Sequence, residues 1–309
     1  MERMSLNIAI SFMFIIGSVS LLIYENNGLF QTLNAQDDVL LNNDSSLQTN
    51  ETELLPYKTV IVQLLADQLE TKLNKSAAIL EIASTLPQIS TLPNASLIDP
   101  SLHGIPKDAD IVKRQIAQNI LSVDKDFERI FYILPNGDMY FEEPYFKQEN
   151  LTINNFAFRD YFKGAISTGQ TYLGNVVISP SSGLPNFNIA VPLYSDKNSG
   201  NTNNTENLIG LFAGDQGLST YYKLLQSLSL PKNEIAVYVD SNGQVISSSV
   251  SLSDISNQNQ FDFRALQSFK DVMNNKSGHN IEKIDGKDRF IVYAPIKFKS
   301  TIWGVLLIS

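Results

Sequence analysis

The chain contains no cysteine and only two histidines, His103 and His279, among its 309 residues. Without cysteine it can form no disulfide framework, thiolate zinc site or iron–sulfur cluster. Neither imidazole has a serine or carboxylate partner nearby in sequence, which argues against a hydrolytic triad. Glu142 and Glu143 are neighbours on an expected strand and point to opposite faces, so they are a poor acid–base pair for a glycosidase. With no phosphate-binding loop or metal-ligand cluster in the sequence either, we expect a non-catalytic protein without a cofactor.

Positive charge and long apolar runs are also scarce. The 23 Lys and Arg residues against 32 Asp and Glu give a net charge of −9, which makes a nucleic-acid partner unlikely to bind. One uncharged run, Leu6 to Tyr24, is long enough to cross a bilayer as a helix. We assign residues 1–35 to a membrane anchor and its flank, with a signal peptide as the alternative, and residues 36–53 to a flexible juxtamembrane segment. Both alternatives place the bulk of the chain outside the cell, and the anchor, which we favour, also makes the membrane a partner.

The second half of the chain contains two copies of one order of elements. Residues 130–144 read as an apolar strand, an Asn-Gly turn and a second strand, and residues 236–249 repeat that order. A short amphipathic helix and further apolar strands follow each hairpin; the strands are expected at 188–194 and 208–215 in the first copy and at 290–296 and 301–309 in the second. A period of roughly a hundred residues is typical of duplicated domains.

Helical periodicity predicts the remaining framework. From Leu54, apolar residues recur at helical spacing up to Pro87, so we expect one long stalk helix over residues 54–87. A second helix is expected over 108–122, ahead of the first hairpin. We divide the rest into a first module, residues 88–217, and a second module, residues 218–309.

This order of parts resembles the double Cache domain, the extracellular sensor of bacterial and archaeal chemoreceptors and histidine kinases. The strings that carry the resemblance are Phe158 to Phe162, Gly183 to Pro185, Ile189 to Pro192 and Gly210 to Asp215, and it extends from Leu54 to Ser309. It implies an α+β fold in which two tandem Per-Arnt-Sim-like (Cache) modules with antiparallel sheets lie on a long N-terminal helix, preceded by one transmembrane helix. It also implies that the first module is membrane-distal and binds a ligand, that the second is membrane-proximal, and that a homodimer could form through the long helix.

The resemblance further implies a set of site residues. Arg159, Tyr161 and Phe162 match the positions that carry ligand contacts on a loop of the first module, and Asp215 matches an acid on a later strand. A guanidinium can bind a ligand carboxylate through two parallel hydrogen bonds, and aromatic faces attract an ammonium group. Asp215 would then accept the ammonium group.

Two further tyrosines, Tyr140 and Tyr172, are expected to lie near this cleft and to line it. The sequence departs from the family pattern at Asn154, where a tyrosine is usual, and at Val177 to Ser179, where the family has a Tyr-X-Asp pair. The expected ligand is therefore an amino acid, an amine or another small carboxylate.

Plainer interpretations remain open for the same residues. Arg159 could pair with Asp160 on the surface, Tyr161 and Phe162 could be core residues, and Asp215 could cap a helix that begins near Leu218. The competing function is an extracellular solute-binding or adhesion protein without signalling output.

Overall fold

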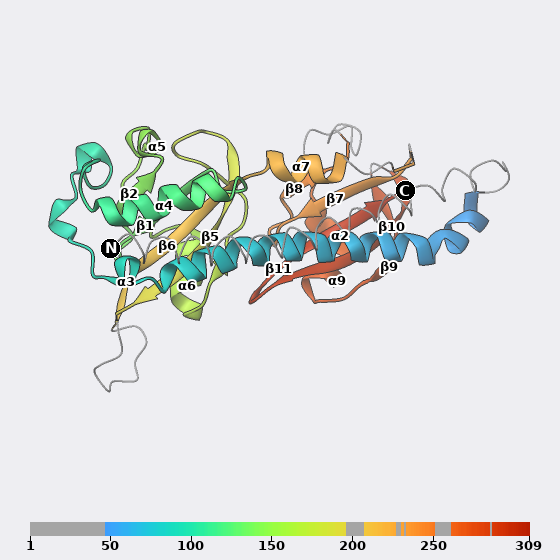
Figure 1. The fold of residues 1–309 in the computed structure, drawn as a ribbon. Coiled ribbons are helices and arrows are strands. Elements are labelled where there is room, and N and C mark those ends of the chain that lie inside the picture. The colour runs from blue at the N-terminus through green and yellow to red at the C-terminus, as the bar shows by residue number, and fades with distance from the viewer. Residues whose placement is uncertain (1–46, 196–206, 227–229, 232, 251–260, 285) are drawn as a thin grey trace.

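The computed structural model describes residues 47–195, 207–226, 230–231, 233–250, 261–284 and 286–309 (Figure 1). The predicted membrane anchor at residues 1–35 lies outside these residues. Within the described part of the chain, no helix combines the length and the apolar character that a bilayer span requires.

A long helix, α2 (Leu47–Ser84), runs beside both halves of the molecule (Figure 1). Its apolar face belongs to the main core, with Leu65, Leu69, Leu73 and Leu80 fully buried. The helix begins inside the segment 36–53 that we expected to be flexible, because glutamine and glutamate there are good helix formers. It ends ahead of Pro87, which lacks the N–H that would continue the helix and which opens the short helix α3 (Pro87–Ser90).

The first module is built on an antiparallel sheet. Its strands are β1 (Arg129–Ile133), β2 (Met139–Glu143), β3 (Tyr172–Leu173), β4 (Val177–Ile178), β5 (Pro185–Tyr194) and β6 (Leu208–Gly217). They are arranged in the order β2-β1-β6-β5-β3, and β4 also pairs with β5. The two longest strands, β5 and β6, and the hairpin β1–β2 form the body of the sheet.

The second module repeats this arrangement. Its strands are β7 (Ile235–Val239), β8 (Val245–Ser248), β9 (Gly278–Ile284), β10 (Lys287–Phe298) and β11 (Thr301–Ile308). Their order, β8-β7-β11-β10-β9, corresponds strand for strand to that of the first sheet. The Asn-Gly turns of the two hairpins place Gly137 and Gly243 at positive φ angles of 92° and 75°, which glycine adopts at no steric cost. The predicted α+β fold with antiparallel sheets on a long N-terminal helix is confirmed.

Helices cover the two faces of each sheet. The other described helices are α4 (Ile111–Val123), α5 (Tyr145–Glu149), α6 (Asp160–Thr168), α7 (Ser219–Gln226) and α9 (Gln267–Met273), with 3-10 turns η1 (Ala95–Leu97), η2 (Pro100–Leu102) and η3 (Phe263–Ala265). In the first module, α2 and α4 pack on one face of the sheet, whereas α6 packs on the other. We call the face under α6 the outer face. In the second module, α9 covers the corresponding face.

The two modules share one continuous core along α2. Trp303 of β11 is fully buried, and its ring meets that of Phe187 on β5 edge-on, with centroids 4.9 Å apart. Tyr221 of α7 packs on the same phenylalanine at 5.3 Å. This aromatic joint connects the second sheet to the first and stabilises their relative position.

Replacing Trp303 with alanine is therefore expected to lower the free energy of unfolding by about 3–5 kcal/mol, because it leaves a large cavity at the joint. Urea denaturation followed by circular dichroism measures the change. Ile281→Ala on β9 is the matched control, since that side chain is 68% exposed and its truncation should change stability by less than about 0.5 kcal/mol. Equal losses in the two variants would contradict a joint centred on Trp303.

Candidate ligand-binding site

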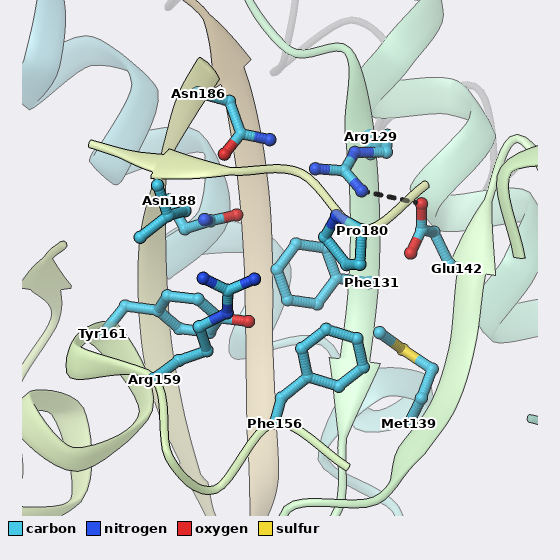
Figure 2. A pocket seen from close by; sticks show the side chains of 11 residues that line it. Arg129, Phe131, Met139, Glu142, Phe156, Arg159, Tyr161, Pro180, Asn186 and Asn188 are labelled. Atoms are coloured by element: carbon cyan, nitrogen blue, oxygen red, sulfur yellow. Dashed lines mark hydrogen bonds and ion pairs between the residues drawn. The ribbon is translucent and has the colours of Figure 1, made fainter. Parts of the chain in front are cut away.

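A pocket opens on the outer face of the first sheet, beside the N-terminus of α6 and the loop that follows β4 (Figure 2). The open space is about 270 Å³, counting its mouth to solvent. The lining residues are Arg129, Phe131, Met139, Glu142, Phe156, Arg159, Tyr161, Val177, Pro180, Asn186 and Asn188.

The pocket has an apolar part and a polar end. Phe131, Met139, Phe156 and Tyr161 form the apolar part, and the rings of Phe131 and Tyr161 meet edge-on at 6.1 Å. Burial raises the pKa of the Tyr161 phenol above its ordinary value, so this side chain stays neutral. A mostly apolar cavity with a few convergent polar groups is the usual composition of a small-molecule site.

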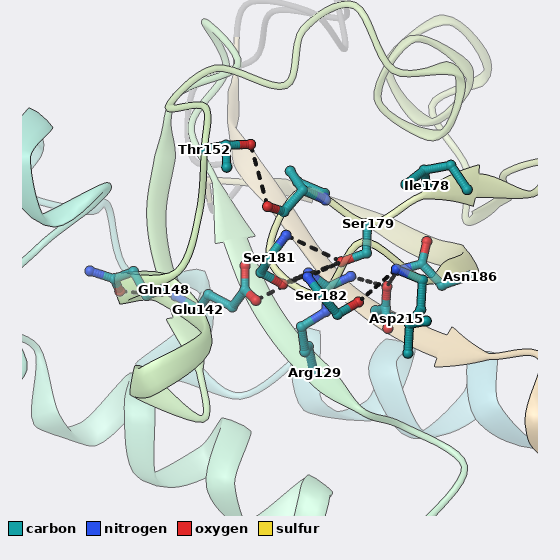
Figure 3. A network of polar contacts seen from close by, with 12 residues as sticks. Arg129, Glu142, Gln148, Thr152, Ile178, Ser179, Ser181, Ser182, Asn186 and Asp215 are labelled. Atoms are coloured by element: carbon teal, nitrogen blue, oxygen red, sulfur yellow. Dashed lines mark hydrogen bonds and ion pairs between the residues drawn. The ribbon is translucent and has the colours of Figure 1, made fainter.

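Arg129 is at the centre of the polar end (Figures 2 and 3). Its Nη1 donates to Glu142 Oε1 at 3.2 Å and to the Ser181 hydroxyl at 2.7 Å. Its Nη2 donates to Asp215 Oδ2, and the Asn186 amide donates to that same oxygen. The guanidinium therefore connects three strands, β1, β2 and β6, and the loop after β4.

This cluster buries one positive charge with two carboxylates. Arg129, Glu142 and Asp215 are each at most 4% exposed. Burial raises the pKa of the Glu142 carboxyl, Arg129 opposes that rise, and the charge of Asp215 adds to it. Burial also raises the pKa of Asp215, again with Arg129 opposing. Burial would lower the pKa of Arg129, but the two carboxylates raise it above its ordinary value, so Arg129 stays charged.

Two acceptors in this cluster lack a hydrogen-bond donor. Asp215 Oδ1 and Asn186 Oδ1 are buried and accept no hydrogen bond from the described residues. A buried acceptor without a donor costs about 1–3 kcal/mol. The polar end thus has an excess of negative charge and of acceptors, which a ligand with a positively charged donor would satisfy.

The second module shows which side chains the same fold carries at the matching positions. Arg129 pairs with Asp215 across β1 and β6, and Asn188 of β5 faces Asp215 from the other side. The corresponding residues of the second sheet, by strand order and register, are Ile235, Ile308 and Ile291. All three isoleucines are in the core under α9.

Glu142 also has an uncharged residue at the matching position of the second sheet. Glu142 pairs with Phe131 in the first hairpin, and Ser248 pairs with Val237 in the second. A buried ion pair generally stabilises a protein no better than apolar side chains of similar volume. Because the duplicate folds with isoleucines, the charged cluster of the first module is better explained by binding than by stability.

Two of the residues expected from the sequence line the pocket. Arg159 stands just before α6, and its Nη2 donates to the Ile178 carbonyl at 3.1 Å while its guanidinium lies over the Phe158 ring at 4.9 Å. Tyr161 is buried in the pocket wall. Among the described residues no ion pair joins Arg159 to Asp160, whose carboxylate instead accepts from the backbone N–H groups of Tyr161 and Asn175 at 2.7 Å.

The other expected residues do not line the pocket. Phe162 packs in the core beneath α6, and Tyr172 packs against Gly164 of that helix. Tyr140 lies on the opposite face, where its hydroxyl donates to Asp110 Oδ2 at 3.0 Å. Asp215 is fully buried behind the wall, held by Arg129, and it is not a helix cap because β6 continues through Gly217.

A β-bulge explains the position of Tyr140. The register of β1 and β2 shifts between Tyr132 and Ile133, which leaves Tyr140 as the extra residue of β2. Strict alternation would place Tyr140 on the face of Glu142, but the bulge turns Tyr140 and Phe141 both toward the main core.

Arg129, Glu142, Asn186 and Asn188 were not expected from the sequence. Each is a polar residue within an otherwise apolar strand, and Asn186 and Asn188 also alternate with apolar neighbours. Polar residues at core positions of a strand are a signal that could have identified them.

Comparisons with known proteins agree with this architecture. A family model described as Cache domain matches residues 43–308. The ligand-binding domain of the Pseudomonas aeruginosa PAO1 amino acid chemoreceptor PctC, in complex with GABA, superposes with a TM-score of 0.55 at 18% identity, covering 82% of this chain and 98% of that one. The PctB domain of the same organism, in complex with L-Arg, gives 0.57 at 18% identity over 83% and 87% of the two chains.

A third solved structure is the ligand-binding domain of the Pseudomonas fluorescens chemoreceptor CtaA in complex with L-isoleucine. It superposes with a TM-score of 0.55 at 18% identity and covers 85% of this chain and 95% of that one. At such identities the likeness is one of fold. A comparison with curated proteins found no match.

The charged cluster makes a clear prediction for stability. Arg129→Ile leaves Glu142 and Asp215 as buried carboxylates without a cation, so the free energy of unfolding near neutral pH should fall by about 3–5 kcal/mol. A triple variant that copies the second module, with Arg129→Ile, Glu142→Ser and Asp215→Ile, should recover most of that loss because no buried charge is left unpaired. Urea denaturation of both variants checks this, and a triple variant less stable than the single one would contradict it.

Proposed function

Since the chain belongs to the Cache domain family, we propose that it is the extracellular small-molecule sensing domain of a membrane-anchored receptor, not an enzyme. Its pocket in the first, membrane-distal module binds an amino acid, an amine or a small organic acid. The observation that carries this proposal is the buried charged cluster of the first sheet, because isoleucines and a serine stand at the matching positions of the second sheet.

The chemistry of the pocket supports a small ligand with charged ends. Arg159 is half-buried at the pocket wall, and its planar guanidinium can bind a carboxylate through two hydrogen bonds. Phe131 and Tyr161 supply aromatic surface that attracts a cation. The solved relatives are described with GABA, L-Arg and L-isoleucine bound, which supports a ligand of this class here.

A chain of hydrogen bonds from the pocket to the second module favours a sensor over a protein that only captures a solute. Asp160, between the pocket residues Arg159 and Tyr161, accepts from the Asn175 N–H. Asn175 Oδ1 in turn accepts from the backbone N–H and the hydroxyl of Ser241, at 3.2 and 2.5 Å. We call the contact between Asn175 and Ser241, together with the neighbouring one described next, the inter-module bridge.

The second contact of the bridge joins the residues next to Asn175 and Ser241 in the sequence, Val176 and Asp240. The Val176 N–H donates to Asp240 Oδ2 at 2.9 Å, and the next residue, Val177, lines the pocket. Asp240 and Ser241 lie at the turn of the hairpin β7–β8. A ligand that favours one position of the segment between β3 and β4 would thereby favour one position of the second sheet and of α2. Such a displacement of α2 is the signal that we propose for the receptor.

A thermal-shift screen of the purified protein against amino acids, amines and small carboxylates tests the binding function. A ligand present at a hundred times its dissociation constant should add about 2.7 kcal/mol of stability. Arg159→Ala should abolish the shift of a ligand that carries a carboxylate and leave the melting temperature without ligand nearly unchanged, because the Arg159 side chain makes only one hydrogen bond, to an exposed residue, in the described structure. Lys163→Ala, an exposed cation of the same helix, is the control that should keep the shift; a carboxylate ligand whose shift survives Arg159→Ala would refute this contact.

The inter-module bridge is tested by hydrogen exchange with a ligand found in that screen. In the wild type, ligand should slow amide exchange in the β7–β8 hairpin, which has no residue in the pocket. Asn175→Ala should remove that protection while changing the affinity less than about threefold. Asn274→Ala at the end of α9 is the control. Protection that persists without the Asn175 side chain would mean that coupling takes another route.

A further inference from the structure

The polar end of the pocket contains two carboxylates, and their surroundings differ. Asp215 does not line the cavity, and its Oδ2 accepts hydrogen bonds from both Arg129 and Asn186. Glu142 does line the cavity. Of the two acids, only Glu142 has a surface that a ligand in the pocket could touch.

Glu142 is also the less compensated of the two charges. Arg129 contacts its Oε1 at 3.2 Å, longer than the 2.7 Å contact of the same nitrogen with Ser181. Its Oε2 accepts no hydrogen bond from the residues that the structure describes, although the side chain is only 1% exposed. One guanidinium shared between two ionised acids leaves a formal charge of −1, and of the two acids only Glu142 can present it to the cavity, where the amide oxygen of Asn186 is a further unpaired but uncharged acceptor.

The neighbouring acid of the same hairpin, Glu143, has hydrogen-bond donors on both carboxylate oxygens. Glu143 points to the opposite face, where Arg114 Nη1 donates to its Oε1 at 2.6 Å and Gln118 Nε2 donates to its Oε2 at 3.0 Å. Both of its oxygens are therefore paired. Unlike Glu143, Glu142 therefore keeps one carboxylate oxygen that no donor of the described residues pairs.

We propose that Glu142, and not Asp215, is the specificity-determining carboxylate of the pocket and accepts the hydrogen bond of a ligand's primary ammonium group. This inference rests on the proposed function and narrows its ligand class to small molecules with a positively charged amine. A cation in contact with Glu142 brings the cluster of Arg129, Glu142 and Asp215 to neutrality, whereas an anion at that place would meet the uncompensated charge of the cluster; Arg159, at the pocket wall, is the cation left for a ligand carboxylate. Asp215 is a positioning residue, since it holds Arg129.

Three probes with the same three-carbon skeleton test the proposal by isothermal titration calorimetry on the purified protein. Propylamine is a cation, L-alanine a zwitterion and propionate an anion. The wild type should bind propylamine and alanine more tightly than propionate. Glu142→Gln, which keeps the shape and removes the charge, should weaken binding of the two ammonium probes at least about tenfold, the loss expected for a hydrogen bond to a charged group. Propionate binding should stay the same or improve.

Two further variants separate specificity from stability. Glu142→Asp keeps the charge and should retain part of the preference for ammonium probes. Asp215→Asn should lower the melting temperature, because it weakens the partner of Arg129, and yet keep the wild-type order of the three affinities. Melting curves confirm that each variant is folded before titration.

The outcomes distinguish this inference from the function on which it rests. If the wild type binds the ammonium probes and Glu142→Gln keeps the same preference, or if Asp215→Asn alone loses it, the assignment to Glu142 is overturned while the receptor function stands. If the wild type binds none of the three probes at millimolar concentration, both the inference and the proposed ligand class are overturned.

Discussion

The buried guanidinium of Arg129, between Asp215 on β6 and Glu142 on β2, is the interaction on which the site depends. Without it two carboxylates would be buried on one sheet face with no cation, which would strongly destabilise the fold at neutral pH. With it, the outer face of the sheet can contain an acid that reaches the pocket. Arg129 therefore makes the burial of that second acid possible without fully pairing it.

The two modules share one arrangement of strands and differ in the side chains on the outer faces of their sheets. The second sheet has isoleucines where the first has Arg129 and Asp215, and these isoleucines pack in an apolar core. The aromatic joint of Phe187 and Trp303 and the common helix α2 hold the two sheets together. A rigid second module is suited to transmit a displacement that begins in the first, since packed elements shift as units rather than deform.

The sequence predicted what depends on local pattern and missed what depends on register. Alternation, the Asn-Gly turns and the internal repeat were sufficient for both hairpins, for the long strands of both sheets and for the long helix, but not for the edge strand β9. The family resemblance identified Arg159 and Tyr161. Arg129 and Asp215 are 86 residues apart and meet only because β1 pairs with β6 in one register. No local signal gives that register, so the partner of Asp215 stayed hidden.

The β-bulge in the first hairpin determines which side chains of β2 face the pocket and which face the main core. In the first hairpin it turns Tyr140 into the main core and leaves Met139 and Glu142 on the pocket side. The second hairpin has a register shift at the matching place, between Tyr238 and Val239, and there Ile246 points into the main core. The irregular backbone is thus a property of the fold that both modules share, and the charges are a property of one module alone. The same backbone therefore accommodates both sets of side chains, and the two modules differ by a few substitutions on the outer face of one sheet, with no change in the fold.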